Sequence, residues 1–382
     1  MRPKIAYLRL GPRPIANRTV HEVLVDQLPE FDVVPVDVKS LLRRDPAVMG
    51  RMTTAAAVRY GPTVLLGRHH VKKALFRTRT AFDAMQAAIA RALEGERWAC
   101  TFQMQSLFDG SRPGVPHIVY TDHTHMANLS YASFDRRRLN SRAWIESEQQ
   151  VYDRANAVLT RSSNIARSVV ADYGVDSAKV DCVFVGPNVP FESAAQQRDP
   201  LEILFIGSDW RRKGGPQLLA AFEDVRRRVP GAHLTVIGPA QRDLPRGVTN
   251  LGRQPKHEIW RHLTRAGVFC LPTLLEPFGV VLVEALAAGL PIVASAVGAV
   301  PDMVEDGRNG RLVPPGDVAA LADALTEIVG DARMQERFGT ASRELANARY
   351  DWGVVGRRLR SHVIEAMDAH GAGSLATGTS RR

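Results

Sequence analysis

The chain has 382 residues, a formal net charge of +10, 45% hydrophobic residues and 24% charged residues. This length exceeds one ordinary hydrophobic core and favours two α/β domains of similar size. The composition is typical of soluble globular proteins, and the absence of a long apolar run excludes a membrane-spanning helix.

The first strand-like segment, residues 4–8, lies almost at the start of the chain, so we expect no signal peptide and a cytoplasmic protein. Cys100, Cys182 and Cys270 are odd in number and far apart in the sequence. This spacing argues against a disulfide framework or a metal cluster and favours reduced, buried thiols.

Alternating strand-like and helix-like patterns in the first half predict a parallel sheet wrapped by helices. The expected strands are residues 5–8, 33–36, 98–102, 117–121, 157–160 and 180–185. The expected helices are residues 18–27, 79–93, 141–154 and 163–173.

One basic segment of the first half, residues 68–79, contains seven cationic or histidine side chains, with Val71, Leu75 and Phe76 among the residues between them. If it is helical, Lys72, Phe76 and Arg79 are close neighbours. Three interpretations stay open: a solvated helix face, a contact with an anionic membrane at its inner face, or a contact with an anionic acceptor. Arginine far outnumbers lysine, which is typical of some bacterial genomes, so the net charge alone says little about partners. Nucleic acid is not expected, because no aromatic-interleaved binding module is present.

A second alternating series begins at residue 201 and predicts a second domain of the same class. We expect an N-terminal domain at residues 1–190, a polar linker at 191–200 and a C-terminal domain at 201–348. Asp317 is expected to cap a helix that includes Leu321, Leu325 and Ile328. Residues 353–369 are expected to form a last helix, and residues 371–382 a disordered tail.

Glu276 and Glu284 bracket a glycine that lies between a buried strand-like run and an apolar helix-like run. Glu276 therefore falls at the carboxyl end of a strand, where open α/β sheets bind ligands. Glu284 falls in the first turns of a helix whose N-terminus favours a phosphate. Carboxylates accept hydrogen bonds from paired hydroxyls, so this pattern suits a sugar nucleotide, although either acid alone could be a simple helix cap.

Cations and glycines occur at a second junction between a strand and a helix, in residues 210–215. The segment contains Arg211, Arg212 and Lys213, followed by Gly214 and Gly215. Three basic residues in a row usually form a solvated turn, but their position at this junction favours phosphate binding.

These motifs resemble the donor domain of retaining, family-four glycosyltransferases of the group 1 type. Glu276 and Glu284 match the family's E-x7-E motif, and Lys213-Gly214 matches its phosphate-binding motif. The resemblance covers roughly residues 200–345 and is mostly architectural before residue 190. It implies a GT-B fold, in which two Rossmann-like α/β domains face a central cleft, and a terminal helix at residues 349–370 that crosses back to the first domain.

The resemblance also implies roles for individual residues. Glu284 is expected to hold the ribose hydroxyls, Glu276 to contact the donor sugar, and Lys213 to neutralise the diphosphate. The backbone around the same motifs is expected to contribute to donor binding, at Gly207, Ser208, Phe278, Gly279 and Val280. Arg253, after Leu251-Gly252, is a candidate contact for the base.

The sequence departs from the family pattern at two positions. An arginine is usual where Ser208 stands, and Arg212 or Arg211 is the expected substitute for its charge. The usual glycine pair after the first strand is reduced to Gly11 followed by Pro12, and proline offers no N–H to a phosphate.

Asp122 and His123 end a strand at the position where the family often has a histidine that faces the sugar. Either could stabilise positive charge at the anomeric carbon, or both could belong to a polar strand end. His123 and His125 have no third metal ligand placed with them in the sequence.

We therefore predict a retaining, metal-independent glycosyltransferase that needs a nucleoside-diphosphate sugar and no cofactor. The acceptor is open: a glycan, a lipid-linked acceptor or a small molecule. The alternatives are a sugar-nucleotide epimerase or phosphorylase on the same fold, and a catalytically silent module that binds sugars or anions.

Overall fold

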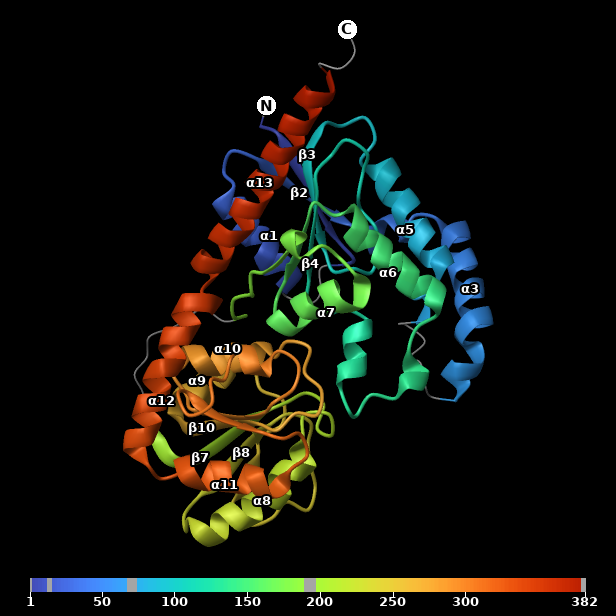
Figure 1. Cartoon of the computed structure of the whole chain (residues 1–382). Helices are drawn as coiled ribbons and strands as arrows, with labels where there is room; N and C mark the ends of the chain where they lie inside the picture. Colours follow the sequence, from blue (N-terminus) through green and yellow to red (C-terminus); the bar gives the residue numbers. More distant parts are fainter. Residues whose placement is uncertain (1, 12–15, 67–73, 189–196, 379–382) are drawn as a thin grey trace. The chain divides into compact units, whose positions relative to one another are not determined.

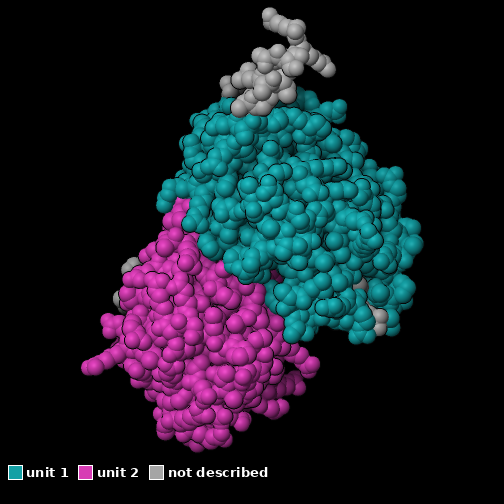
Figure 2. All heavy atoms as spheres, viewed as in Figure 1, with its two compact units in different colours: residues 1–184, 355–382 teal, residues 185–354 magenta. Residues whose placement is uncertain are grey.

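The computed structural model describes residues 2–11, 16–66, 74–188 and 197–378, with side chains up to residue 370. The chain forms two compact units (Figure 2): residues 1–184 with 355–382, called unit 1, and residues 185–354, called unit 2. The division falls after Phe184, earlier than the linker predicted at residues 191–200. Asn188 and Pro187 belong with unit 2, because their carbonyls accept hydrogen bonds from Lys256 and Trp352.

Unit 1 contains a six-stranded parallel sheet with the order β2-β1-β3-β4-β5-β6. Its strands are β1 Lys4–Arg9, β2 Asp32–Asp37, β3 Trp98–Met104, β4 His117–Thr121, β5 Ala157–Thr160 and β6 Val180–Cys182. Its helices are α1 Ala16–Gln27, α2 Val38–Arg43, α3 Pro46–Leu65, α5 Arg79–Ala92, α6 Arg142–Arg154 and α7 Ser163–Tyr173, with short turns η1 Met126–Ser130, η2 Arg136–Arg138 and η3 Ser177–Lys179.

Helices cover both faces of the unit 1 sheet (Figure 1). One face packs against α2, α3 and α5 near β1, and against α6 and α7 near β4 and β5. On the other face, Tyr7 of β1 donates a hydrogen bond to the Asn17 carbonyl of α1. Because both faces are covered, β4 is buried along its whole length, as is usual for parallel sheets.

Unit 2 repeats this architecture with the strand order β12-β11-β10-β7-β8-β9, also parallel. Its strands are β7 Asp199–Ile206, β8 His233–Ile237, β9 Val248–Asn250, β10 Ala266–Leu271, β11 Ile292–Ser295 and β12 Gly310–Val313. Its helices are α8 Gly215–Arg228, α9 Lys256–Arg265, α10 Val280–Ala287, α11 Val318–Ile328 and α12 Ala332–Leu345, with turns η4 Val300–Asp302 and η5 Ala346–Tyr350. Helices α8 and α11 pack together on one face of the sheet, and α9 and α10 lie on the opposite face (Figure 1).

The last helix, α13 Trp352–Gly378, begins in unit 2 and continues in unit 1. Within unit 1 it packs along α1, where Gly356 allows close approach to Val23 and Gln27. Arg360 donates to the Gln27 carbonyl at 2.6 Å and pairs with Glu30 at 2.6 Å. The helix runs further than predicted, because residues 371–378 are helical where the sequence suggested a disordered tail. Residues 379–382 lie outside the described part of the chain.

The prediction of two Rossmann-like α/β units is confirmed. The Asp317 cap is also confirmed, since its carboxylate accepts from the Ala320 N–H at 2.9 Å. All three cysteines are free thiols, and burial raises the pKa of Cys100 to about 12. Among the helices that the structure describes, none combines the length and apolar character needed to cross a bilayer.

The predicted helix at residues 79–93 is confirmed as α5, and the described part of the basic segment before it is not continuous with this helix. The chain turns at Phe76 and Arg77, and α5 begins at Arg79 with Thr78 as its N-cap. Arg79 pairs with Asp83 at 2.9 Å, and the Arg77 guanidinium is directed inward over the Trp144 ring. Residues 67–73, which carry most of the predicted basic patch, lie outside the described residues.

Candidate active site

The predicted donor-binding motifs lie in two loops at one edge of the unit 2 sheet. One loop follows β7 and leads into α8, and the other follows β10 and leads into α10. Strands β7 and β10 are parallel neighbours, in register at Ile203 and Val268. Their carboxyl ends therefore meet at the same edge, which brings the loops of residues 207–214 and 272–279 together.

The two loops touch through their backbones at Gly214. A Cβ atom on this residue would lie 1.9 Å from the Pro272 carbonyl oxygen, and its φ is +78°. Next to this contact, the Leu274 N–H donates to the Arg212 carbonyl at 2.9 Å. Only glycine satisfies both the left-handed backbone and the close approach.

Lys213 and Glu276 form a buried ion pair between the loops, with Lys213 Nζ donating to Glu276 Oε2. Lys213 is 7% exposed and Glu276 is 4% exposed. Burial lowers the pKa of Lys213, and the Glu276 carboxylate opposes this shift. A buried charge is tolerated when it is paired in this way, so the Glu276 carboxylate favours the charged form of Lys213.

Both following helices begin without a side-chain cap. Gly214 precedes α8 and Gly279 precedes α10, each with a left-handed backbone, and neither N-cap residue has a side chain that could accept a hydrogen bond from the first N–H groups of its helix. Their first N–H groups and positive dipole ends therefore suit an anionic ligand at this edge. Pro216 in the first turn of α8 has no N–H, so α10 offers more donors.

Glu284 lies in α10 and is 8% exposed. Burial raises the pKa of its carboxyl to about 7, against the attraction of Lys256 and a hydrogen bond from the Asn188 backbone. Lys256 in turn donates to the Asn188 carbonyl at 3.1 Å. The carboxylate thus lies between Lys256 of α9 and the Asn188 backbone. Its oxygens could accept further hydrogen bonds from hydroxyl groups.

Arg212 has a different environment from the one predicted for a phosphate-binding cation. Its Nη1 donates to the Leu275 carbonyl at 2.6 Å, and its Nε lies 3.4 Å from Asp209. The guanidinium thus fastens the β7 loop to the β10 loop. Arg211 and Ser208 are exposed at the same junction.

The other predicted donor-site residues occupy distinct positions. Gly207 is buried at the end of β7, where its carbonyl leaves room only for a glycine at Gly238. Phe278 is 5% exposed and packs near the Tyr350 ring, while Val280 opens α10. Arg253 is exposed after β9, which β8 separates from β7, so the structure does not bring it to the Lys213–Glu276 pair.

Asp122 and His123 follow β4 in unit 1. Asp122 pairs with Arg161 at 3.7 Å, and the Arg161 guanidinium lies over the Tyr120 ring at 5.0 Å. The His123 carbonyl accepts from the Thr121 hydroxyl at 2.8 Å. His125 is buried, and its Nε2 accepts from the Asn140 N–H at 2.7 Å.

The sequence did not point to Thr273 or Trp210, which support the site. The buried Thr273 hydroxyl contacts the Arg212 carbonyl at 3.2 Å and the Leu275 carbonyl at 3.0 Å. Trp210 packs where any Cβ on Gly215 would collide with its ring, and its ring meets Phe205 edge-on. The glycine after Lys213-Gly214 was a usable signal for such a close contact, whereas nothing in the sequence marked Thr273.

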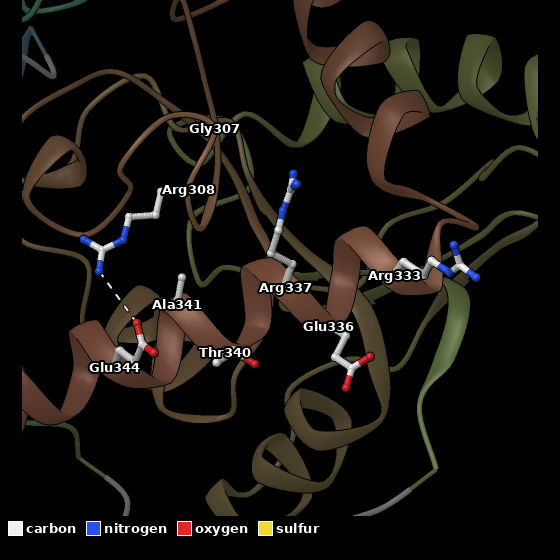
Figure 3. A pocket seen from close by; sticks show the side chains of 8 residues that line it. All are labelled: Gly307, Arg308, Arg333, Glu336, Arg337, Thr340, Ala341 and Glu344. Carbon is white, nitrogen blue, oxygen red and sulfur yellow. Dashed lines mark ion pairs between the residues drawn. The ribbon is translucent and has the colours of Figure 1, made fainter.

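A separate groove of about 660 Å³ runs along α12 in unit 2 and includes none of the predicted site residues (Figure 3). Its arginines are mixed with acids: Arg308 pairs with Glu305 at 2.5 Å and with Glu344 at 3.7 Å. This mixture of charges does not favour a ligand of either sign.

Comparisons with known proteins agree on the region that contains this site. Residues 190–345 match the family model described as glycosyl transferases group 1. A phosphatidyl-myo-inositol mannosyltransferase from Mycobacterium leprae (strain TN) is 36% identical over 202 residues, covering 49% of this chain and 54% of that protein. A glycogen synthase from Mycobacterium tuberculosis (strain CDC 1551 / Oshkosh) is 29% identical over 215 residues, covering 53% and 52%.

The likeness to solved structures extends over nearly the whole chain. Sucrose-phosphate synthase from Thermosynechococcus elongatus has a TM-score of 0.68 at 18% identity, covering 96% of this chain and 100% of that one. The chain spans about half the length of the two curated relatives above. The structural likeness establishes the two-domain fold, and the sequence likeness to the group 1 glycosyl transferases lies in residues 190–345.

Replacing Gly214 by alanine tests the contact between the loops. Gly252→Ala is the matched control, because Gly252 has φ +68° and nothing within 4 Å of its Cβ position. We expect the control to lower the free energy of unfolding by about 1 kcal/mol, the cost of a left-handed alanine. Gly214→Ala should cost at least about 3 kcal/mol, since a clash is added to that strain. If both variants lose the same free energy of unfolding in urea, the Pro272 backbone moves aside without cost and the contact does not constrain the loops.

Replacing Glu284 by glutamine tests its burial. The folded carboxyl has a pKa of about 7 against an ordinary 4.5, so the folded protein binds more protons between these values. The stability of the wild type should therefore be highest below pH 4.5 and fall, relative to Glu284→Gln, as the pH rises through 7. We expect a relative loss on the order of 2 kcal/mol in urea unfolding without donor. The exposed Glu223→Gln variant should follow the wild type; if Glu284→Gln does so too, the carboxyl is not buried as described.

Proposed function

Because residues 190–345 match the group 1 glycosyl transferases, we propose that this chain transfers a sugar from a nucleoside-diphosphate donor to an acceptor. The observation that carries the proposal is the buried Lys213–Glu276 pair between two uncapped helix N-termini. A fixed cation, two dipole ends and a carboxylate in one place suit a ligand with both a diphosphate and hydroxyl groups.

Lys213 has the central electrostatic role in this proposal. When the bond between the anomeric carbon and the phosphate oxygen breaks, negative charge grows on the departing diphosphate. A cation held in a water-poor site stabilises that charge more in the transition state than in the bound donor. Glu276, which holds Lys213 before the donor arrives, would then accept hydrogen bonds from hydroxyl groups of the sugar.

Glu284 is proposed to hold the ribose. Its carboxylate lies within α10, beyond the N–H groups that would face the diphosphate, as the E-x7-E spacing requires. Protonation removes one of its acceptor sites, so a pKa near 7 makes donor binding stronger above neutrality.

We further propose that transfer proceeds with retention and without a metal. The acceptor oxygen would bond to the anomeric carbon on the face that the diphosphate leaves, and its proton would pass to the departing phosphate oxygen. Lys213 and the helix N-termini supply the positive charge that a metal provides elsewhere. That Asp122 or His123 faces the sugar remains a prediction.

The direct test is donor turnover in the presence of a chelator. The protein is incubated with a panel of uridine, guanosine and adenosine diphosphate sugars, a mixture of candidate acceptors and excess EDTA, and the release of nucleoside diphosphate is measured. We expect release with at least one donor, increased by acceptor and unchanged by EDTA. Nuclear magnetic resonance of the product should show the anomeric configuration of the donor.

Other outcomes would change the assignment. Turnover only with inorganic phosphate would indicate phosphorolysis, and interconversion of the donor sugar without release would indicate an epimerase. Donor binding without turnover in any mixture would indicate a silent binding module. Activity abolished by EDTA and restored by magnesium would reject metal independence.

Lys213→Ala separates transition-state stabilisation from binding. We expect kcat to fall by about 100-fold or more, while the Kd for the donor rises less than about tenfold. Lys179→Ala, which removes an exposed lysine of unit 1, should leave both unchanged. Urea unfolding must be measured alongside, because Glu276 loses its partner in this variant. Equal effects on kcat and Kd would contradict the proposed role.

A further inference from the structure

Unit 1 contains a recess of about 560 Å³ at the carboxyl edge of its own sheet. Leu10 follows β1, Leu107 comes shortly after β3, and α2 begins directly after β2. The recess therefore lies at the edge of the sheet where α/β proteins bind ligands, and its volume suits a small organic ligand. It is lined by Leu10, Lys39, Leu42, Arg43, Met49, Leu75, Phe76, Arg77 and Leu107.

The interior of the recess is apolar. Leu10 and Leu42 belong to the buried core between the sheet and α2, α3 and α5, and Met49, Leu75 and Leu107 pack against that core. The hydroxyl groups of a sugar would find few polar partners on these walls. A hydrocarbon chain would instead be transferred out of water, and none of its groups would lack a hydrogen-bond partner.

Two cations of α2 line the same recess. Lys39 and Arg43 are four residues apart on one face of the helix, and Lys39 Nζ lies 5.3 Å from the centre of the Phe76 ring. Arg43 is exposed, and Lys39 is half-buried. Among the described residues that line the recess none is acidic, in contrast to the groove along α12.

The third cation of the lining, Arg77, is already engaged on the other side. Its guanidinium lies 4.8 Å from the Trp144 ring, and its Nη1 is 3.4 Å from His125 Nδ1. Its contribution to the recess is therefore mainly the apolar stem. Lys39 and Arg43 remain as the charges that an incoming anion would meet.

Helix α3, which supplies Met49 to the recess, also exposes apolar side chains to solvent. Val58 is 79% exposed, Leu65 is 89% exposed, and Leu66 directly after the helix is 65% exposed. Three of the four large apolar side chains that are exposed in the described chain thus lie in or next to α3. Such exposure is unusual in a water-soluble surface and fits contact with hydrocarbon.

We propose that this recess binds the acceptor and that the acceptor is a lipid phosphate, with its hydrocarbon in the recess and its phosphate between Lys39 and Arg43. This inference rests on the proposed glycosyltransferase function and specifies its acceptor class. The apolar walls select the chain, and the two cations without an acidic neighbour in the lining select the phosphate.

Calorimetric titration with decyl phosphate below its micelle-forming concentration tests the recess directly. We expect saturable binding at one site by the whole chain. Leu75→Trp, which fills the recess, should weaken binding at least tenfold, and Lys39→Gln with Arg43→Gln should do the same without altering the apolar walls. Arg51→Gln removes an exposed cation of α3 that does not line the recess and should bind like the wild type.

Decanol and inorganic phosphate separate the two parts of the ligand. Each should bind at least tenfold more weakly than decyl phosphate, and equal binding by decanol would overturn the phosphate assignment. Undiminished binding by Leu75→Trp, provided that its unfolding curve matches the wild type, would place the lipid elsewhere and overturn the proposal. Binding of the donor nucleotide is measured on the wild type and on every variant. If the wild type does not bind the donor, the proposed function is rejected. If it binds the donor but not decyl phosphate, only the acceptor class is rejected.

Discussion

The pairing of Lys213 with Glu276 depends on a backbone contact that brings two loops of unit 2 together. Lys213 lies one residue before the point where Gly214 meets the Pro272 carbonyl, and Glu276 lies in the same loop as that carbonyl. Because β7 and β10 are adjacent and parallel, the loops cannot separate without disturbing the sheet. The position of the cation is thus set by the core of the unit, and the reacting group needs little reorganisation when a ligand arrives.

The neighbouring acids have different electrostatic environments. Glu276 faces a cation at contact distance, while Glu284 is buried with Lys256 as a more distant partner, and its pKa rises to about 7. Burial without a close partner disfavours the charged form, so Glu284 gains most from a ligand that donates hydrogen bonds. Two carboxylates of one motif can therefore serve one ligand in different ways, one by releasing a lysine and the other by accepting hydroxyl groups.

Local patterns in the sequence predicted most of this arrangement, because central strands such as β10 are apolar and the loops that follow β7 and β10 carry Gly and charge. The order of the strands, and with it the contact between Lys213 and Glu276, depends on tertiary structure and was not predicted; the family resemblance suggested only that both residues serve one donor. Helix α3 was missed because Gly50, Gly61 and Pro62 weaken its helical pattern, although Asp45 caps it at 3.1 Å. The helix that begins at Arg79 was predicted, whereas its N-cap Thr78 was not. The sequence could not show that the Arg212 guanidinium reaches the Leu275 carbonyl, and the role of Arg212 toward a phosphate stays a prediction.

Gly214 and Lys213 are adjacent in the sequence, but the backbone geometry requires the first and the proposed ligand chemistry requires the second. The glycine is needed wherever the chain adopts this shape, whereas the role proposed for the lysine, beyond its pairing with Glu276, concerns a bound donor. A related chain that had lost its activity would still have to keep the glycine to fold, but could exchange the lysine together with its acidic partner. Among related chains, the residue at the position of Lys213 is therefore the one to examine when deciding whether a chain can still be active.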